Sequence, residues 1–145
     1  MFPNRCGYLP GKQIVPAEQM LAKVKAALDA RRDGDLFIAA RTDAAGVTSV
    51  EDAIARCQLF MEAGADMAKP MGLDTIPDIK RALREIPGPH MATLSQAAGP
   101  KARSLEDLEA AGVVAATFPS VALFAAANAV RNGLRLLKRD NSLAP

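Results

Sequence analysis

Helix-length amphipathic segments alternate with short apolar runs along this chain, and this alternation most limits the folds that it can adopt. Helices are predicted over residues 17–32, 48–64, 75–87, 104–112 and 120–139, and buried strands over 36–40, 65–68, 90–94 and 113–117. Two helices end alike, because Glu62-Ala-Gly-Ala and Glu109-Ala-Ala-Gly-Val both place a glycine before the next strand. Such repeated units indicate parallel strands joined by right-handed helical crossovers, as in doubly wound sheets and (β/α)8 barrels.

Several predicted helices begin with residues that cap helix backbones. Thr48-Ser-Val-Glu51 has the spacing of a capping box, in which a side-chain oxygen accepts a hydrogen bond from a backbone N–H of the first turn. Ser104-Leu-Glu-Asp107 is expected to cap the fourth helix, and Ser120 the last one. These local signals set the expected helix starts.

Length and charge exclude several classes of function. The 145 residues suit one domain, and a net charge of +2 with scattered basic residues implies no nucleic-acid or membrane partner. No apolar run approaches the ~20 residues of a membrane helix, and the first residues lack a signal-peptide pattern, so a cytoplasmic protein is expected. No glycine-rich fingerprint follows a predicted strand, which argues against a dinucleotide site.

The two cysteines lack metal-ligand spacing and are expected to be free thiols. Cys57 has the helical spacing of a core residue and is interpreted as a small hydrophobe. Cys6 lies in a proline- and glycine-rich loop over residues 1–16, beside Arg5, whose charge favours a thiolate. Without a dedicated histidine, this context alone is weak support for a reactive Cys6.

In parallel α/β folds the active site lies at the carboxyl ends of the strands, so the residues that follow each predicted strand are candidates. Arg41 directly follows an apolar run. Two interpretations of Arg41 stay open. Its guanidinium either grips a substrate carboxylate through two hydrogen bonds or pairs internally with Asp43 or another acid.

Other strand ends carry weaker candidates. Thr93 and Ser95 share one face of a strand, where they either bind a carboxylate or serve as ordinary turn residues. Lys69 is a catalytic amine or, as we expect, a surface lysine with its charge in water. His90 begins a strand at the opposite end and is expected to be structural.

Four stretches together resemble a known enzyme family. They are the loop Phe2-Pro-Asn-Arg-Cys-Gly-Tyr-Leu-Pro-Gly-Lys-Gln-Ile-Val-Pro16, then Ala40-Arg-Thr-Asp-Ala44, Glu62-Ala-Gly-Ala-Asp-Met67 and Phe118-Pro-Ser120. The loop resembles the signature loop of the isocitrate lyase/phosphoenolpyruvate mutase superfamily, and most of all that of its 2-methylisocitrate lyase branch. The resemblance covers nearly the whole chain and implies a (β/α)8 barrel that binds Mg²⁺ and a small 2-oxo or 2-hydroxy polycarboxylate. Such enzymes cleave or rearrange a C–C or P–C bond through an enolate, whose charge the metal stabilises.

The resemblance also implies roles for residues of this chain. Cys6 matches the loop cysteine that acts as acid and base in the lyase branch, and Arg41 matches the arginine that binds a substrate carboxylate. The other substrate-binding positions implied by the resemblance are Gly7, Tyr8, Thr93 and Ser95.

Four positions depart from the family pattern. Asn4 stands in place of a lysine, Tyr8 of a histidine, Met71 of a glutamate and Thr93 of an asparagine. Met71 has no carboxylate to hold a metal-bound water, and Asn4 has no charge to stabilise an enolate or a thiolate. These changes weigh against cysteine catalysis even though Cys6 is retained.

The resemblance matches this chain to barrel strands five to eight. Residues 1–145 are therefore expected to form a single partial barrel domain, with the signature loop at 1–16, alternating helices and strands over 17–139, and a tail at 140–145. The family's Mg²⁺-binding acids lie on earlier strands, so no metal ligands are recognisable here, and the chain alone is expected to be inactive.

Half a barrel leaves sheet edges and an apolar face open, so either a homo-oligomer or a complementary half-barrel is expected as the partner. A carbon–carbon bond lyase is the expected activity. The alternative is a catalytically inactive relative, or a truncated fragment, that serves as an assembly or binding module.

Overall fold

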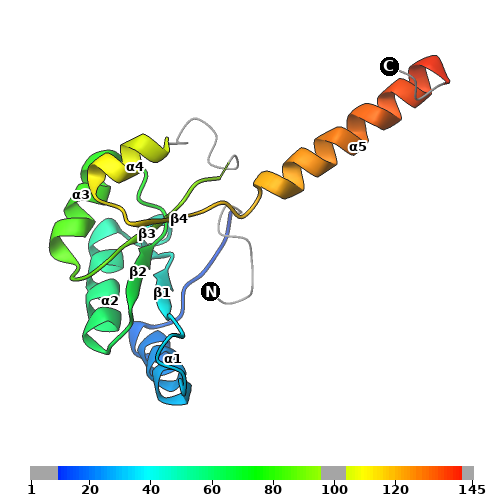
Figure 1. Ribbon diagram of the computed structural model, residues 1–145. Helices are drawn as coiled ribbons and strands as arrows, with labels where there is room; N and C mark the ends of the chain where they lie inside the picture. The colour runs from blue at the N-terminus through cyan, green and yellow to red at the C-terminus, as the bar shows by residue number, and fades with distance from the viewer. Residues whose placement is uncertain (1–9, 96–103, 142–145) are drawn as a thin grey trace.

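Four short parallel strands lie side by side in chain order, and a helix follows each of them (Figure 1). The structure is a computed structural model that describes residues 10–95 and 104–141. Its strands are β1 Ala39–Thr42, β2 Met67–Pro70, β3 Met91–Thr93 and β4 Ala115–Thr117. Its helices are α1 Ala17–Ala30, α2 Val50–Glu62, α3 Ile76–Glu85, α4 Leu105–Ala111 and α5 Val121–Asp140, with a 3₁₀ turn η1 at Ala44–Gly46.

The pairing of the strands is parallel throughout the described chain. β1 pairs with β2 so that Arg41 lies opposite Lys69, and β3 pairs with β4 in the same sense. An isolated parallel bridge between Ala68 and His90 joins the two pairs. The predicted alternation of helices with parallel strands is therefore confirmed, and the carboxyl ends of all four strands lie at the same edge of the sheet.

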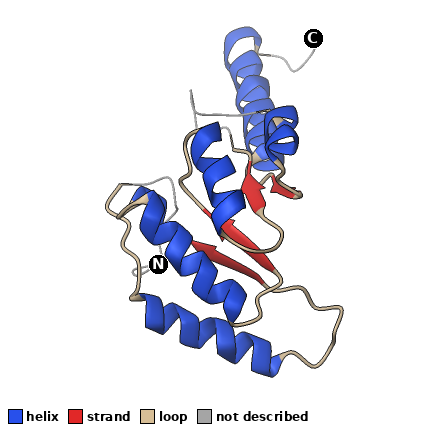
Figure 2. Ribbon diagram, turned by 90° about the vertical axis from the view of Figure 1, so that its left-hand side faces the viewer, coloured by secondary structure: helices blue, strands red, loops and turns tan. Residues whose placement is uncertain are grey.

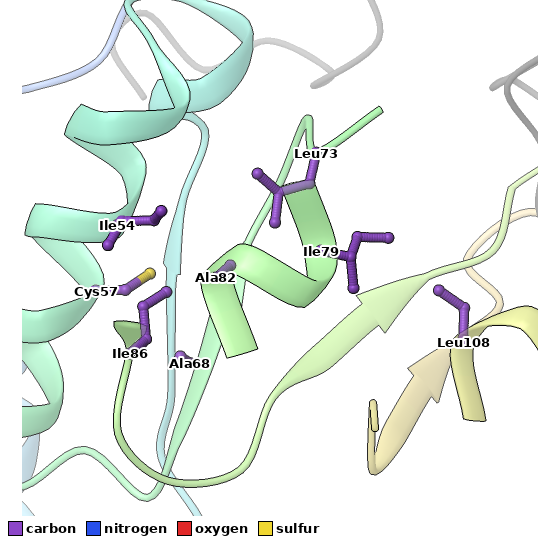
Figure 3. Close-up of a cluster of buried hydrophobic side chains, with 8 residues drawn as sticks. All are labelled: Ile54, Cys57, Ala68, Leu73, Ile79, Ala82, Ile86 and Leu108. Atoms are coloured by element: carbon purple, nitrogen blue, oxygen red, sulfur yellow. The ribbon is translucent and has the colours of Figure 1, made fainter. Parts of the chain in front are cut away.

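The main core lies between the strands and the helices on one side of them. Figure 2, turned so that this side faces the viewer, shows the helices in front of the strands. The buried cluster in Figure 3 consists of Ile54, Cys57, Ala68, Leu73, Ile79, Ala82, Ile86 and Leu108. Cys57 is fully buried within it, and this burial raises the pKa of its thiol to about 12. The interpretation of Cys57 as a small core hydrophobe is confirmed.

Two predicted strands are misplaced along the chain. The strand predicted at 36–40 lies at Ala39–Thr42, and Leu36 and Phe37 are 55% and 54% exposed instead of buried. The strand predicted at 65–68 lies at Met67–Pro70. Both errors have one cause: a strand extends where its neighbour offers hydrogen-bonding groups, and apolar composition alone does not fix that register.

The helix starts agree more closely with the sequence signals. Ser104 accepts a hydrogen bond from the Asp107 backbone, and the Asp107 carboxylate accepts one from the Ser104 backbone, which completes a capping box. The box predicted to begin at Thr48 is wrong by one residue, because Ser49 accepts the cap hydrogen bond from the Asp52 backbone. The Thr48 hydroxyl donates instead to the Asp52 carboxylate.

Helix α5 projects away from the rest of the described chain (Figure 1). Of its 20 residues none is buried, although the helix has a clearly apolar side. The exposed apolar side chains on it are Val121, Leu123, Phe124, Val130, Leu134 and Leu137. No helix of the described residues is both long and apolar enough to cross a membrane. The expected open apolar face is therefore present, and α5 carries much of it.

Candidate active site

The sheet has two faces with different surroundings. Ala40 and Ala68 are buried in the clusters formed with the helices. Because side chains alternate along a strand, Arg41, Lys69 and Thr93 lie on the opposite face. Burial in β1 alternates in the same way, with Arg41 exposed between two buried residues. We call this opposite face, with Arg41, Lys69 and Thr93 at its carboxyl edge, the open face.

Arg41 is held in place by a buried carboxylate. Its Nε and Nη2 atoms donate to the two carboxylate oxygens of Asp43, both at 2.9 Å. Asp43 is only 5% exposed, and Lys12 Nζ lies 3.5 Å from its Oδ1 atom. The internal ion pair considered from the sequence is therefore present. It does not cover Arg41, whose side chain stays 41% exposed, so the guanidinium retains an accessible side.

Lys69 crosses the open face from β2 toward β4. Its Nζ atom donates to Thr117 Oγ1 at 3.1 Å, although β3 lies between these two strands. Burial lowers the pKa of Lys69, the charge of Arg41 lowers it further, and Asp43 partly opposes both effects. The expectation of a surface lysine is met only in part, because Lys69 is half-buried and its ammonium group donates to a hydroxyl of β4.

Hydroxyl groups of β3 and β4 continue from Lys69. Thr117 Oγ1 lies 3.0 Å from Thr93 Oγ1, and the Thr93 hydroxyl also contacts the Met71 sulfur at 3.4 Å. Ser95 is buried one step further on, and its Oγ atom lies 3.2 Å from Ser120 Oγ. Thr93 thus belongs to the cluster around Lys69, whereas Ser95 contacts Ser120, the residue that precedes α5.

Sequence reasoning missed Thr117 as a site residue. Thr117 was the last residue of a predicted strand. That it lies opposite Thr93 depends on the pairing of β3 with β4, which the sequence does not show. Lys12 was missed as well, since it approaches Asp43 from a loop 31 positions earlier in the chain. The only available signal for Thr117 was its place at a strand end, where polar residues of parallel folds gather.

Several predicted site residues lie outside the described part of the chain. They are Cys6, Gly7 and Tyr8, together with the departing position Asn4. His90 is described and is buried at the other end of its strand, where its Nε2–H donates to the Ile86 carbonyl at 3.1 Å. This contact agrees with the structural role expected for His90.

The described residues do not fit a magnesium ion. Within 10–95 and 104–141 no three His, Cys, Asp or Glu residues group together as metal ligands. The carboxylate at the open face, Asp43, is already held by Arg41 with Lys12 close by. Mg²⁺ prefers oxygen ligands, and the Met71 thioether is a soft ligand that suits other metals.

The sequence has clear relatives. The sequence model of the phosphoenolpyruvate phosphomutase family matches residues 5–138. A curated relative, 2-methylisocitrate lyase of Aeropyrum pernix, is 34% identical over 135 residues, which cover 93% of this chain and 43% of the relative. The chain thus spans about half the length of the curated relatives that it matches.

Solved structures match with the same coverage. Oxaloacetate acetylhydrolase in complex with 3,3-difluorooxalacetate has a TM-score of 0.91 at 25% identity, and the match covers 100% of this chain and 50% of the chain of that structure. Phosphonopyruvate hydrolase in complex with oxalate and Mg²⁺ has a TM-score of 0.75 at 28% identity, covering 99% and 50%. Such structures are barrels of the PEP mutase/isocitrate lyase superfamily. The predicted fold, the carboxyl-terminal half of a (β/α)8 barrel with about four βα units, is confirmed.

Proposed function

The chain belongs to the phosphoenolpyruvate phosphomutase family, and from this membership we propose that it supplies the carboxyl half of a barrel enzyme acting on a small polycarboxylate. The reaction is the cleavage or rearrangement of a C–C or P–C bond in a 2-oxo or 2-hydroxy acid, and a 2-methylisocitrate-like substrate is the first choice. Residues 1–145 act in this proposal as one partial barrel domain. One observation carries it: Arg41 is fixed by Asp43 and yet exposed at the carboxyl edge of the open face.

The charges at this edge favour an anionic ligand. Arg41, Lys12 and Lys69 surround a single carboxylate, Asp43, so the described cluster has an excess of positive charge. Asp43 occupies the Nε side of the guanidinium, which holds its plane in one orientation. A guanidinium held in this way can bind a second carboxylate through its remaining N–H groups with little loss of side-chain entropy.

The proposed roles of the other site residues rest on the family resemblance. Cys6 is the acid and base that exchanges a proton with the carbon skeleton, and Gly7 and Tyr8 contact the substrate. Thr93 and Ser95 complete the carboxylate site with their hydroxyls. The contact of Thr93 with Thr117 on the open face supports its share of this role.

Magnesium belongs to this proposal only through the relatives. The phosphonopyruvate hydrolase structure contains Mg²⁺ together with oxalate. Since the described residues do not fit the ion, its ligands would have to be other residues of the completed barrel. The role of this half in the proposal is to bind and orient the substrate carboxylate.

A second function, that of a binding or assembly module without turnover, is favoured by Met71 at the position where the family has a glutamate. The exposed apolar side of α5 suits either function, because it needs a partner in both. We take a second copy of this chain as that partner, with a complementary half-barrel as the other candidate.

The test is the binding of oxalate to the purified chain by titration calorimetry. Replacing Arg41 by lysine keeps the charge but loses the planar fork, and it should weaken binding roughly tenfold. Arg84→Lys, on the exposed surface of α3, is the matched control and should bind like the unaltered protein. Absence of binding by the unaltered chain, or equal affinity of both variants, contradicts the proposed site.

Turnover distinguishes the two functions. The chain, together with a complementary half-barrel that carries metal-binding acids, is incubated with Mg²⁺ and 2-methylisocitrate, and the release of pyruvate is followed with a coupled dehydrogenase. Release that depends on Arg41 supports the enzyme. Oxalate binding without release supports the binding module.

A further inference from the structure

Lys69 is a nucleophilic side chain of the open face that the family resemblance leaves without a role. It lies opposite Arg41 in the register of two adjacent parallel strands, and both side chains are on the open face. The charge of Arg41 acts on the Lys69 amine, so the two groups belong to one cluster. A ligand carboxylate bound at Arg41 would therefore bring the rest of a small acid into the same cluster as the amine.

We propose that Lys69 condenses with the carbonyl carbon of a 2-oxo acid whose carboxylate is bound by Arg41. This inference takes its ligand class from the proposed function and adds a covalent step to it. The carboxylate of the ligand binds Arg41 and its oxo carbon meets Lys69. Both can occur in one small molecule because the oxo carbon of such an acid is bonded directly to the carboxylate carbon.

The surroundings of Lys69 favour the unprotonated amine that this reaction needs. Burial and the positive charge of Arg41 lower its pKa, and Asp43, which opposes them, is already held by Arg41 and Lys12. The group of β4 that contacts Lys69 is the Thr117 hydroxyl, which in turn contacts the Thr93 hydroxyl of β3, and neither carries a charge. Lysines with a lowered pKa serve as nucleophiles toward carbonyl groups in other proteins.

The step balances without any further reactant. The neutral Lys69 nitrogen forms a bond to the oxo carbon, and one of its protons passes to the former carbonyl oxygen to give a carbinolamine. This hydroxyl takes up one proton from solvent and leaves as water, and a protonated C=N bond remains. Thr117 Oγ1, which lies 3.1 Å from Lys69 Nζ and 3.0 Å from Thr93 Oγ1, can relay the protons. The protonated imine withdraws electrons from the adjacent carbon, as enolate-type chemistry demands.

The experiment is reductive trapping on the purified 145-residue chain. Pyruvate is added at neutral pH with sodium borohydride, which reduces the imine to a stable secondary amine, and peptides are analysed by mass spectrometry. We expect the peptide with Lys69 to gain the mass of the acid less one oxygen atom, in at least about tenfold higher yield than Lys80. Lys80 is an exposed lysine on α3 and serves as the internal control.

Variants separate this inference from the proposed function. Lys69→Arg keeps the charge and cannot form the imine, so the adduct should vanish. Lys80→Arg should leave the adduct unchanged, and lactate, which lacks the oxo group, should give none.

Oxalate binding without an adduct at Lys69 overturns the inference and leaves the proposed function intact. Labelling of Lys80 equal to that of Lys69 also overturns it, since that is ordinary amine reactivity. An adduct at Lys69 with a yield that Arg41→Met does not change supports the imine and contradicts the carboxylate site.

Discussion

Arg41 and Lys69 lie opposite each other on adjacent parallel strands, so two basic side chains share one face of the sheet. The carboxylate beside them is that of Asp43, which is buried and paired with Arg41. Like charges on directly opposite residues of neighbouring strands repel, which is unfavourable in a protein that only has to fold. The arrangement is favourable in a protein that receives an anion there. This charge distribution is the one that the proposed binding of a carboxylate requires.

The thiol of Cys57 should be unreactive in the folded protein. Its pKa is raised from 9.0 to about 12 by burial, which lowers the thiolate fraction at pH 8 roughly a thousandfold. Labelling with iodoacetamide in a Cys6→Ser background should be negligible in buffer and complete in urea. Equal labelling rates in both conditions would mean that α2 does not pack as described.

Gly72 should not tolerate a side chain. Its φ of 86° is unfavourable for other residues, and a Cβ atom would lie 2.9 Å from the backbone nitrogen of Gly46. Gly72→Ala should lower the free energy of unfolding by about 1–3 kcal/mol in urea denaturation. Gly133→Ala in α5 is the control, because no atom lies within 4 Å of its Cβ position and alanine favours the helix. A loss of stability in the control alone would contradict this explanation.

The pH dependence of stability should report the burial of His90. Burial lowers its pKa from 6.5, so in this range the unfolded chain binds a proton more readily than the folded chain. The contribution of the neutral His90 ring to stability is complete above pH 6.5 and is lost as the pH falls from there toward the lowered pKa. In this range the free energy of unfolding should fall by at most ~1.4 kcal/mol per pH unit. Urea denaturation at several pH values measures this slope.

His90→Gln supplies the comparison for that measurement, because glutamine can donate a hydrogen bond but does not titrate. His90 is the only histidine of the chain, so the slope between pH 5 and 7 should largely disappear in the variant. A slope that is the same in both proteins would have to arise from other groups.

The apolar side of α5 should mediate self-association. Leu134 is exposed among Arg131, Arg135 and Lys138, so Leu134→Lys adds charge repulsion to a surface that buries nothing in the single chain. Sedimentation velocity should show a shift from oligomer to monomer with little change in the stability of the sheet. Arg135→Lys on the same helix should leave association unchanged. A monomeric unaltered chain would contradict the choice of a second copy as partner.

A feature could be predicted from the sequence when the residues that determine it are close together along the chain. The capping box at Ser104 depends on a residue three positions away and was visible in the sequence. The placement of β1 depends on pairing with β2, 28 positions further on, and was wrong by up to three residues. Lys69 was misjudged for the same reason, because its hydrogen-bond acceptor, Thr117, is 48 positions away.

The candidate site was predictable where it consisted of residue types at strand ends. Arg41, Thr93 and Ser95 were chosen on that basis, and the pairing of Arg41 with Asp43 was one of two open alternatives. The bridging of β2 to β4 by Lys69 could not be foreseen, since it requires the order and register of the strands.

Helix α5 has a thermodynamic consequence for the behaviour of the chain. A helix of this length without tertiary contacts is only marginally stable in water, since most helical stability in proteins comes from packing of one face. Its folding is therefore linked to whatever covers its apolar side. If a second copy of the chain covers it, as predicted above, mass action makes the helical content of α5 rise with protein concentration. The open face at the carboxyl edge adjoins the start of this helix, through the contact of Ser95 with Ser120. Dilution would in that case unfold α5 and loosen the site as well.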